Sequence, residues 1–232
     1  MKKFLCVILG ILFVLALVAC GKEKTDPAAT ATEEPTRPEA ALLSLVESFD
    51  ASKVNGFDYA LEQTLNDTIV NRHTVSIRLN SANRTVASRV ETRKSLNEEF
   101  DGDQFTETTV TTYYRNGQIA TQGNGVWSWN DGSLDEFLSV NLQALRFDFS
   151  LLRDLNFTTS EEQSVLTFRI DDANAAAFLG ITRAVKDLSF EIKSDVAGEI
   201  LLSFTMRYAQ DLTSTVISLT SYSGSTNITL PD

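Results

Sequence analysis

The feature that most constrains the fold is a two-residue alternation of apolar side chains that recurs after residue 56. It is clear in segments 57–61, 75–79 and 202–208. Successive side chains of a strand point to opposite faces of its sheet, so this pattern is typical of strands with one buried face. Asn116-Gly117 and Asn124-Gly125 are the residue pairs that tight hairpin turns favour. The chain is therefore predicted to form consecutive antiparallel strands.

The residues expected on the buried face fall into two groups, separated by the middle of the chain. They are Phe57, Tyr59, Leu61, Val75, Ile77, Leu79, Val86, Val90, Thr108, Val110, Thr112 and Tyr114, then Leu166, Phe168, Ile170, Leu188, Phe190, Ile192, Leu202, Phe204, Met206, Tyr208, Thr215, Ile217, Leu219, Ile228 and Leu230. No long helical pattern separates the strands of the second group. Two runs of strands of this kind favour a single antiparallel sheet.

Three short helices are predicted around these strands. Apolar residues recur at helical spacing from Glu39 to Phe49. Ser133 and Glu136 have the spacing of a capping box before Phe137 and Leu138. A third helix is expected from Asp172 to Leu179, capped by Asp171 or Asp172 and ended by Gly180. The predicted fold class is α+β but mostly β: a single strongly curved antiparallel sheet, a half-barrel, with a few helices packed on its concave face.

The N-terminus has the pattern of a secretory signal. Lys2 and Lys3 precede an apolar segment from Phe4 to Val18, which is shorter than the about 20 residues that a transmembrane helix needs. The segment closes on Leu17-Val18-Ala19-Cys20-Gly21 and resembles the lipobox of bacterial lipoprotein precursors. That resemblance implies that the Cys20 thiol carries a diacylglyceryl group and anchors the protein to the outer side of a bacterial cell membrane. The alternative is ordinary secretory cleavage that leaves a free thiol.

The same resemblance divides the chain into three parts. Residues 1–19 form the signal peptide, residues 20–38 the acylated cysteine and a tether, and residues 39–232 one domain. The tether carries Pro27, Pro35 and Pro38 among small and polar residues, a composition that cannot bury enough apolar surface to fold.

The charge balance bears on possible partners. The chain has 20 Lys and Arg against 31 Asp and Glu, for a formal net charge of -11, and loss of Lys2 and Lys3 makes the mature chain more acidic. A basic footprint for nucleic acid is absent from such a composition. An anionic bilayer repels an acidic surface, so membrane attachment is expected to depend on the acyl chains at Cys20.

Catalytic and metal chemistry finds little support in the sequence. Cys6 lies in the signal, Cys20 is the lipid site, and His73 is the one histidine, so a His- or Cys-based triad and a zinc site are not expected. His73 is predicted to lie at the surface near the start of a strand. The acidic cluster in residues 98–103 fits a solvated loop better than a calcium site. No catalytic residue, metal or cofactor is predicted, although a hydrolase that uses paired carboxylates stays open.

Several segments, together with the lipobox and tether, resemble the LolA/LppX-like half-barrel lipoproteins over roughly residues 40–232. They are Tyr113-Tyr114-Arg115-Asn116-Gly117, the nearby Trp127 and the closing stretch 222–231. The resemblance implies a curved sheet partly closed by helices around an apolar cavity, and a carrier of a lipid or acyl chain.

The candidate ligand-binding residues at the rim of such a cavity are Trp127, Trp129, Phe137 and Leu138. They can equally be ordinary core residues. In that alternative the core is filled, and the domain is a non-catalytic module that binds another protein of the cell envelope.

Overall fold

The computed structural model describes residues 37–80, 83–96, 105–140, 145–195 and 200–232, within a compact unit that spans Arg37–Asp232. The described strands are β1 (Gly56–Leu65), β2 (Thr68–Leu79), β3 (Val86–Leu96), β4 (Phe105–Arg115), β5 (Gln118–Gly123), β6 (Val126–Asp131), β7 (Leu152–Thr159), β8 (Gln163–Ile170), β9 (Lys186–Asp195), β10 (Ile200–Gln210) and β11 (Thr213–Tyr222). The described helices are α2 (Pro38–Glu47), α3 (Leu134–Leu138), α4 (Asp172–Phe178) and the 3-10 turns η1 (Ala51–Lys53) and η2 (Phe149–Leu151).

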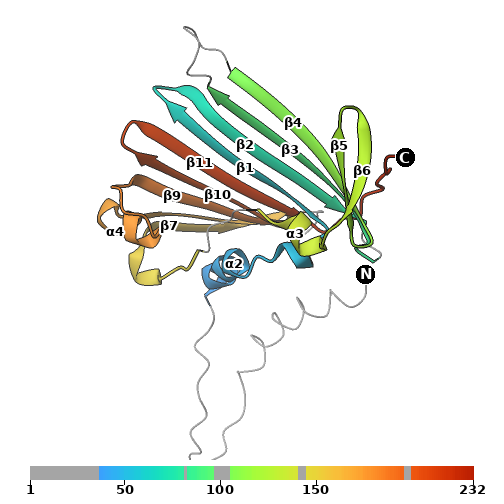
Figure 1. The fold of residues 1–232 in the computed structure, drawn as a ribbon. Helices are drawn as coiled ribbons and strands as arrows, with labels where there is room; N and C mark the ends of the chain where they lie inside the picture. Colours follow the sequence, from blue (N-terminus) through green and yellow to red (C-terminus); the bar gives the residue numbers. More distant parts are fainter. Residues whose placement is uncertain (1–36, 81–82, 97–104, 141–144, 196–199) are drawn as a thin grey trace, which may run out of the picture. The chain divides into compact units, whose positions relative to one another are not determined.

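The described strands form one antiparallel sheet in the order β6-β5-β4-β3-β2-β1-β11-β10-β9-β8-β7. Each half of this order is a run of sequence neighbours, and the halves join where β1 pairs with β11 in the middle. The sheet is strongly curved and stays open, with β6 and β7 at its two edges (Figure 1). The prediction of a mostly β protein with one large antiparallel sheet and few helices is thus confirmed.

Two of the hairpin turns follow directly from the sequence. Asn116 and Gly117 have φ of 48° and 87°, and Asn124 and Gly125 have φ of 51° and 79°. Positive φ at both central residues is the geometry of a type I′ turn, whose twist matches that of the strands it joins. The predicted hairpins β4–β5 and β5–β6 are confirmed.

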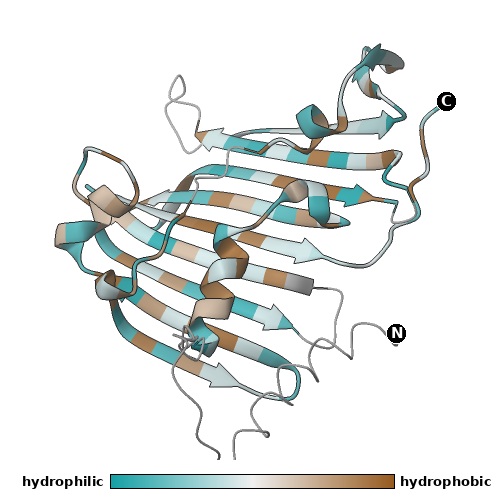
Figure 2. Ribbon diagram, turned by 90° about the horizontal axis from the view of Figure 1, so that it is seen from below, coloured by the Kyte–Doolittle hydropathy of each residue, from teal (hydrophilic) through white to brown (hydrophobic). Residues whose placement is uncertain are grey.

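The face of the sheet that carries the side chains of Phe57, Val75 and Ile77 is called the inner face below, and the opposite face is the outer face. Helix α2 packs on the inner side of β9 and β10 and buries Leu42, Leu43 and Val46. Figure 2 views the sheet from the helix side and shows that the helices cover only part of it.

The other two predicted helices are also present. The Ser133 hydroxyl accepts a hydrogen bond from the Glu136 backbone N–H at 3.1 Å, as a capping box requires. Helix α4 ends before Gly180, whose φ of 64° suits glycine at a helix end. Asp171 occupies the N-cap position of α4, but its carboxylate pairs with Arg153 at 2.9 Å instead of capping the helix.

Four phenylalanines fill the space between the crossing segment 145–149, α4 and the sheet. Phe168 and Phe190 stack with ring centroids 4.8 Å apart, and Phe147 meets them edge-on at 5.6 and 5.5 Å. Phe178 from α4 closes the group at 5.8 Å from Phe190. Aromatic pairs prefer these stacked and edge-to-face arrangements. This part of the interior is therefore filled with side chains.

Two strand predictions were wrong, and one strand was missed. Ala87 pairs with Leu79 and lies on the inner face, so Val86 and Val90 point outward and Val90 is 38% exposed. Ile228 and Leu230 are outside any strand, because β11 is already paired on both sides and the chain continues past the end of the sheet. Strand β7 was not predicted, since a bulge between Arg153 and Asn156 interrupts its alternation.

Gly56 lies where β1 approaches β2 closely. A Cβ at this position would lie 2.7 Å from the backbone oxygen of Ile77. We expect Gly56→Ala to lower the free energy of unfolding by about 1–3 kcal/mol, the usual cost of overpacking. Chemical denaturation measures it, with Gly123→Ala as the control because a Cβ there meets no atom within 4 Å. Equal stability of the two variants would contradict the close contact.

Candidate functional site

The inner face changes character across the sheet. From β8 to β2 most inner-face residues are apolar, and the buried apolar ones belong to the core. On β3 the inner positions after Ala87 are Arg89, Glu91 and Arg93, which pair across the sheet with Ile77, Val75 and His73 of β2. The inner face thus carries mainly apolar side chains from β8 to β2 and charged side chains on β3.

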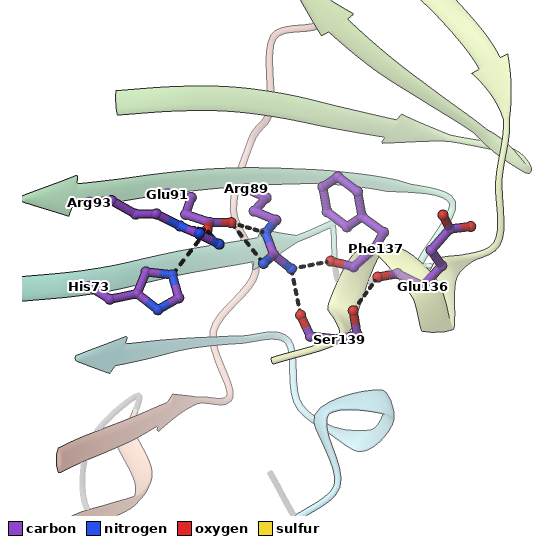
Figure 3. Close-up of polar contacts among 7 residues, drawn as sticks. All are labelled: His73, Arg89, Glu91, Arg93, Glu136, Phe137 and Ser139. Atoms are coloured by element: carbon purple, nitrogen blue, oxygen red, sulfur yellow. Dashed lines mark hydrogen bonds and ion pairs between the residues drawn. The ribbon is translucent and has the colours of Figure 1, made fainter. Parts of the chain in front are cut away.

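Glu91 is the centre of a charged cluster formed with His73, Arg89 and Arg93 (Figure 3). Its Oε1 accepts from Arg93 Nε at 2.8 Å and lies 3.0 Å from His73 Nε2. Its Oε2 accepts from Arg89 Nη2 at 2.9 Å. These four residues are called the Glu91 cluster below.

Arg89 joins the Glu91 cluster to α3. Its Nη1 donates to the carbonyl oxygens of Phe137 at 2.9 Å and Ser139 at 2.7 Å, at the C-terminal end of that helix. Cations stabilise this end of a helix because its last carbonyls have no partner within the helix. One partly buried arginine therefore binds both the sheet carboxylate and the helix end (Figure 3).

The cluster strongly favours the ionised form of Glu91. Partial burial by itself raises the pKa of this carboxyl group, but hydrogen bonds from Arg89 and Arg93, with a further one from His73, outweigh it and lower the pKa to about 2. The carboxylate is thus charged at any physiological pH and holds both guanidinium groups in place.

Apolar side chains lie beside the Glu91 cluster on the same face. Arg93 pairs with His73, His73 with Leu61, and Leu61 with Ile217, which makes one row across β3, β2, β1 and β11. Leu61 and Ile217 are only partly buried. Val110 of β4 pairs with Glu91 and is 49% exposed. The cluster is thus bordered by apolar surface that helices do not fully cover.

Tyr59 packs beside the Glu91 cluster. Its ring meets the His73 ring edge-on, with ring centroids 5.9 Å apart. Burial raises the pKa of the Tyr59 hydroxyl, with a smaller contribution from Tyr208. His73 lies in the middle of β2 with a side chain 29% exposed, so its predicted place at the start of a strand was wrong.

The four predicted rim residues are not brought together. Trp127 and Trp129 do lie on one face of β6, as predicted, but it is the outer face, where Trp127 meets Tyr113 at 5.3 Å and Arg115 lies over Trp129 at 4.3 Å. Phe137 and Leu138 of α3 are buried in the core on the inner side. A pocket of about 450 Å³ does open beside Leu138, between η1 and the end of α3, but its lining includes neither tryptophan.

The remaining predictions concern the lipid site, the acidic cluster, metal binding and membrane-spanning helices. Cys20 and the acidic residues in 98–103 lie outside the described residues. Within the described ranges, no group of three or more His, Cys, Asp or Glu side chains is placed to hold a metal ion. None of the described helices is long and apolar enough to cross a bilayer.

Comparisons with known proteins provide little guidance. No protein family and no curated protein matches the chain. Among solved structures it is similar to LprF from Mycobacterium bovis, at 11% identity and a TM-score of 0.37 over 85% of this chain and 98% of that one. It is also similar to the acyl-CoA thioesterase II TesB2 from Mycobacterium marinum, at 10% identity and a TM-score of 0.14 over 80% and 87%. Similarities this weak establish neither kinship nor function.

The Glu91 cluster was missed by the sequence analysis, although one signal was present. Arg89, Glu91 and Arg93 are spaced two residues apart, so they must share a face of a strand. Because Val86 and Val90 are apolar, the prediction placed them on the buried face, and it therefore assigned Arg89, Glu91 and Arg93 to the wrong face.

Proposed function

We propose that this protein is a lipid-anchored extracytoplasmic protein without enzymatic activity, and that it binds an amphiphilic ligand along the part of the inner face, on β11 and β1 to β4, that the helices leave partly exposed. The N-terminal lipobox pattern supports the anchor at Cys20 and the location at a bacterial cell membrane. The ligand is a molecule with an acyl chain, such as a single lipid. Neither a metal nor a cofactor takes part.

The single observation that carries the proposal is the combination of exposed apolar and ordered polar groups on one surface. Val110 is half-exposed and Leu61 is partly buried, and both lie directly beside the Glu91 cluster, while the partly buried Ile217 lies next to Leu61. Binding sites for small molecules combine apolar surface with a few fixed polar groups. The apolar residues would bind the chain of an amphiphile, and the cluster would face its polar end.

The proposed place differs from the cavity expected between sheet and helices. The four phenylalanines and the buried residues of α2 occupy that space next to β8, β9 and β10. The region under β3 and β4 lies away from α2 (Figure 1). A ligand there would cover apolar surface without displacing the core. Each Å² of apolar surface removed from water would contribute about 25 cal/mol to binding.

A matched pair of valines tests the proposal. Val110 and Val90 are similarly exposed, at 49% and 38%, but lie on the inner and outer faces of neighbouring strands. We expect Val110→Gln to weaken binding of dansylundecanoate about tenfold. Burial of the Val110 side chain by the ligand would contribute about 1.5 kcal/mol, and the substitution removes this contribution. Fluorescence titration of the mature chain, with Cys20→Ser to omit the anchor, measures the affinity.

Val90→Gln is the control for this titration and should bind the probe as the unsubstituted chain does. Equal weakening in both variants would mean that the probe binds outside the inner face. No binding to the unsubstituted chain would overturn the proposed function itself.

A second candidate function is the envelope protein-interaction module. Trp127, Trp129 and Tyr113 form a half-exposed aromatic group on the outer face of the edge hairpin. Aromatic side chains of this kind are enriched at protein interfaces. Cross-linking from position 127 in cells, compared with position 110, would capture a protein only if this alternative holds.

A further inference from the structure

The Glu91 cluster carries more positive than negative charge. Arg89 and Arg93 flank a single carboxylate, and Glu91 is the one acid among the described inner-face residues of β1 to β4. This local excess is unusual in a chain whose formal net charge is -11. Among the described residues, Glu91 is the one acid paired with Arg89 and Arg93.

The two arginines differ in what they can still bind. Arg89 is 17% exposed and uses Nε, Nη1 and Nη2 on Glu91 and on the carbonyls at the end of α3. Arg93 is 71% exposed, while Glu91 Oε1 holds its Nε at 2.8 Å and its Nη2 at 2.7 Å. Arg93 thus presents an oriented guanidinium group to the solvent side of the inner face.

Polar residues lie beside Arg93 on both neighbouring strands. Thr108 pairs with it on β4, and His73 pairs with it on β2. Leu61 and Ile217 continue the same row. Neighbouring strands lie about 4.8 Å apart, so the row from β3 to β11 covers about 14 Å, comparable with a medium-length acyl chain.

We infer that the ligand is an anionic amphiphile whose carboxylate or phosphate group binds Arg93 while its apolar part lies against Val110, Leu61 and Ile217. This inference rests on the proposed function and adds the chemical class of the ligand. Arginine binds carboxylate and phosphate through charge-assisted hydrogen bonds, which are stronger than those between neutral groups. Glu91 does not repel the ligand, because its charge is compensated by the arginines that hold it.

The test compares dansylundecanoate with its uncharged methyl ester, which have the same fluorophore and chain. The mature chain with Cys20→Ser is expected to bind the acid about tenfold more tightly than the ester. Arg93→Gln should remove this preference by weakening only the acid, and Arg93→Lys should retain most of it.

Lys94 provides the matched control. It is the next residue of β3, points to the outer face and lies over the Phe105 ring at 4.6 Å. Lys94→Gln removes the same charge from the chain and should leave the preference for the acid intact. Thermal unfolding of each variant establishes that it is folded.

Four other outcomes are each decisive. Equal affinity for acid and ester would overturn the anionic class while leaving amphiphile binding in place. A preference for the acid that survives Arg93→Gln would overturn the role of Arg93. Loss of the preference in Lys94→Gln as well would assign it to overall charge and overturn the role of Arg93. Failure of both probes to bind would overturn the proposed function as well.

Discussion

Phe168→Ala should reduce the free energy of unfolding by about 3–5 kcal/mol, the largest effect expected from a single core substitution in this chain. Phe168 is 2% exposed, stacks on Phe190 and receives the edge of Phe147. Its removal leaves a cavity where the crossing segment 145–149 packs on the sheet, and relaxation of that segment fills such a cavity only in part. Denaturant titration followed by circular dichroism measures the change.

The control for this substitution is Phe149→Ala. Phe149 is 38% exposed and contacts Arg37 through its ring face, so the same change of side chain should cost less than about 1 kcal/mol. A similar loss in both variants would contradict the filled interior between α4 and the sheet.

Glu91→Gln should lower the free energy of unfolding by about 3 kcal/mol at neutral pH. The amide cannot compensate Arg89, which is largely buried, and removal of one partner from a buried ion pair is costly. A shift of the pKa from 4.5 in the unfolded chain to about 2 in the folded chain corresponds to a contribution of similar size. Glu62→Gln is the control, since the Glu62–Arg72 pair is exposed and should contribute about 0–1 kcal/mol.

The pH dependence of this effect has a definite sign. Because folding lowers the pKa of Glu91, its contribution is fully present above about pH 4.5 and is lost as the pH falls towards 2. The difference in stability between the unsubstituted chain and Glu91→Gln should therefore shrink across this range. A difference that stays constant from pH 5 to pH 2 would show that Glu91 is not stabilised as a carboxylate.

Much of the fold could be predicted because local chemistry determines it. Tight hairpin turns need positive φ at both central residues and therefore favour Asn-Gly pairs. Ser133 and Glu136 form a capping box that marks the start of a helix. The alternation at Phe57 and Tyr59 and at Val75 and Ile77 specified both the strands and their buried face. These signals lie within a few residues of each other and need no knowledge of distant contacts.

The candidate site could not be predicted in the same way, because it depends on contacts between strands and with α3. Val86 and Val90 are apolar, as buried residues usually are, yet they lie on the outer face. The inner positions belong to Arg89, Glu91 and Arg93, whose charges compensate one another, and Arg89 also donates hydrogen bonds to the carbonyls at the end of α3. Trp127 and Trp129 share a face, as predicted, but which face that is depends on the register of β5 against β6. Register is a long-range property that a single sequence does not display.

The most direct test of ligand binding on the inner face is methyl NMR of the mature chain carrying Cys20→Ser, titrated with stearic acid. The methyl resonances of Val110, Leu61 and Ile217 should shift, while those of Val90 on the outer face should stay in place. Shifts confined to the outer face, or none at all, would contradict an amphiphile bound on the inner face of this sheet.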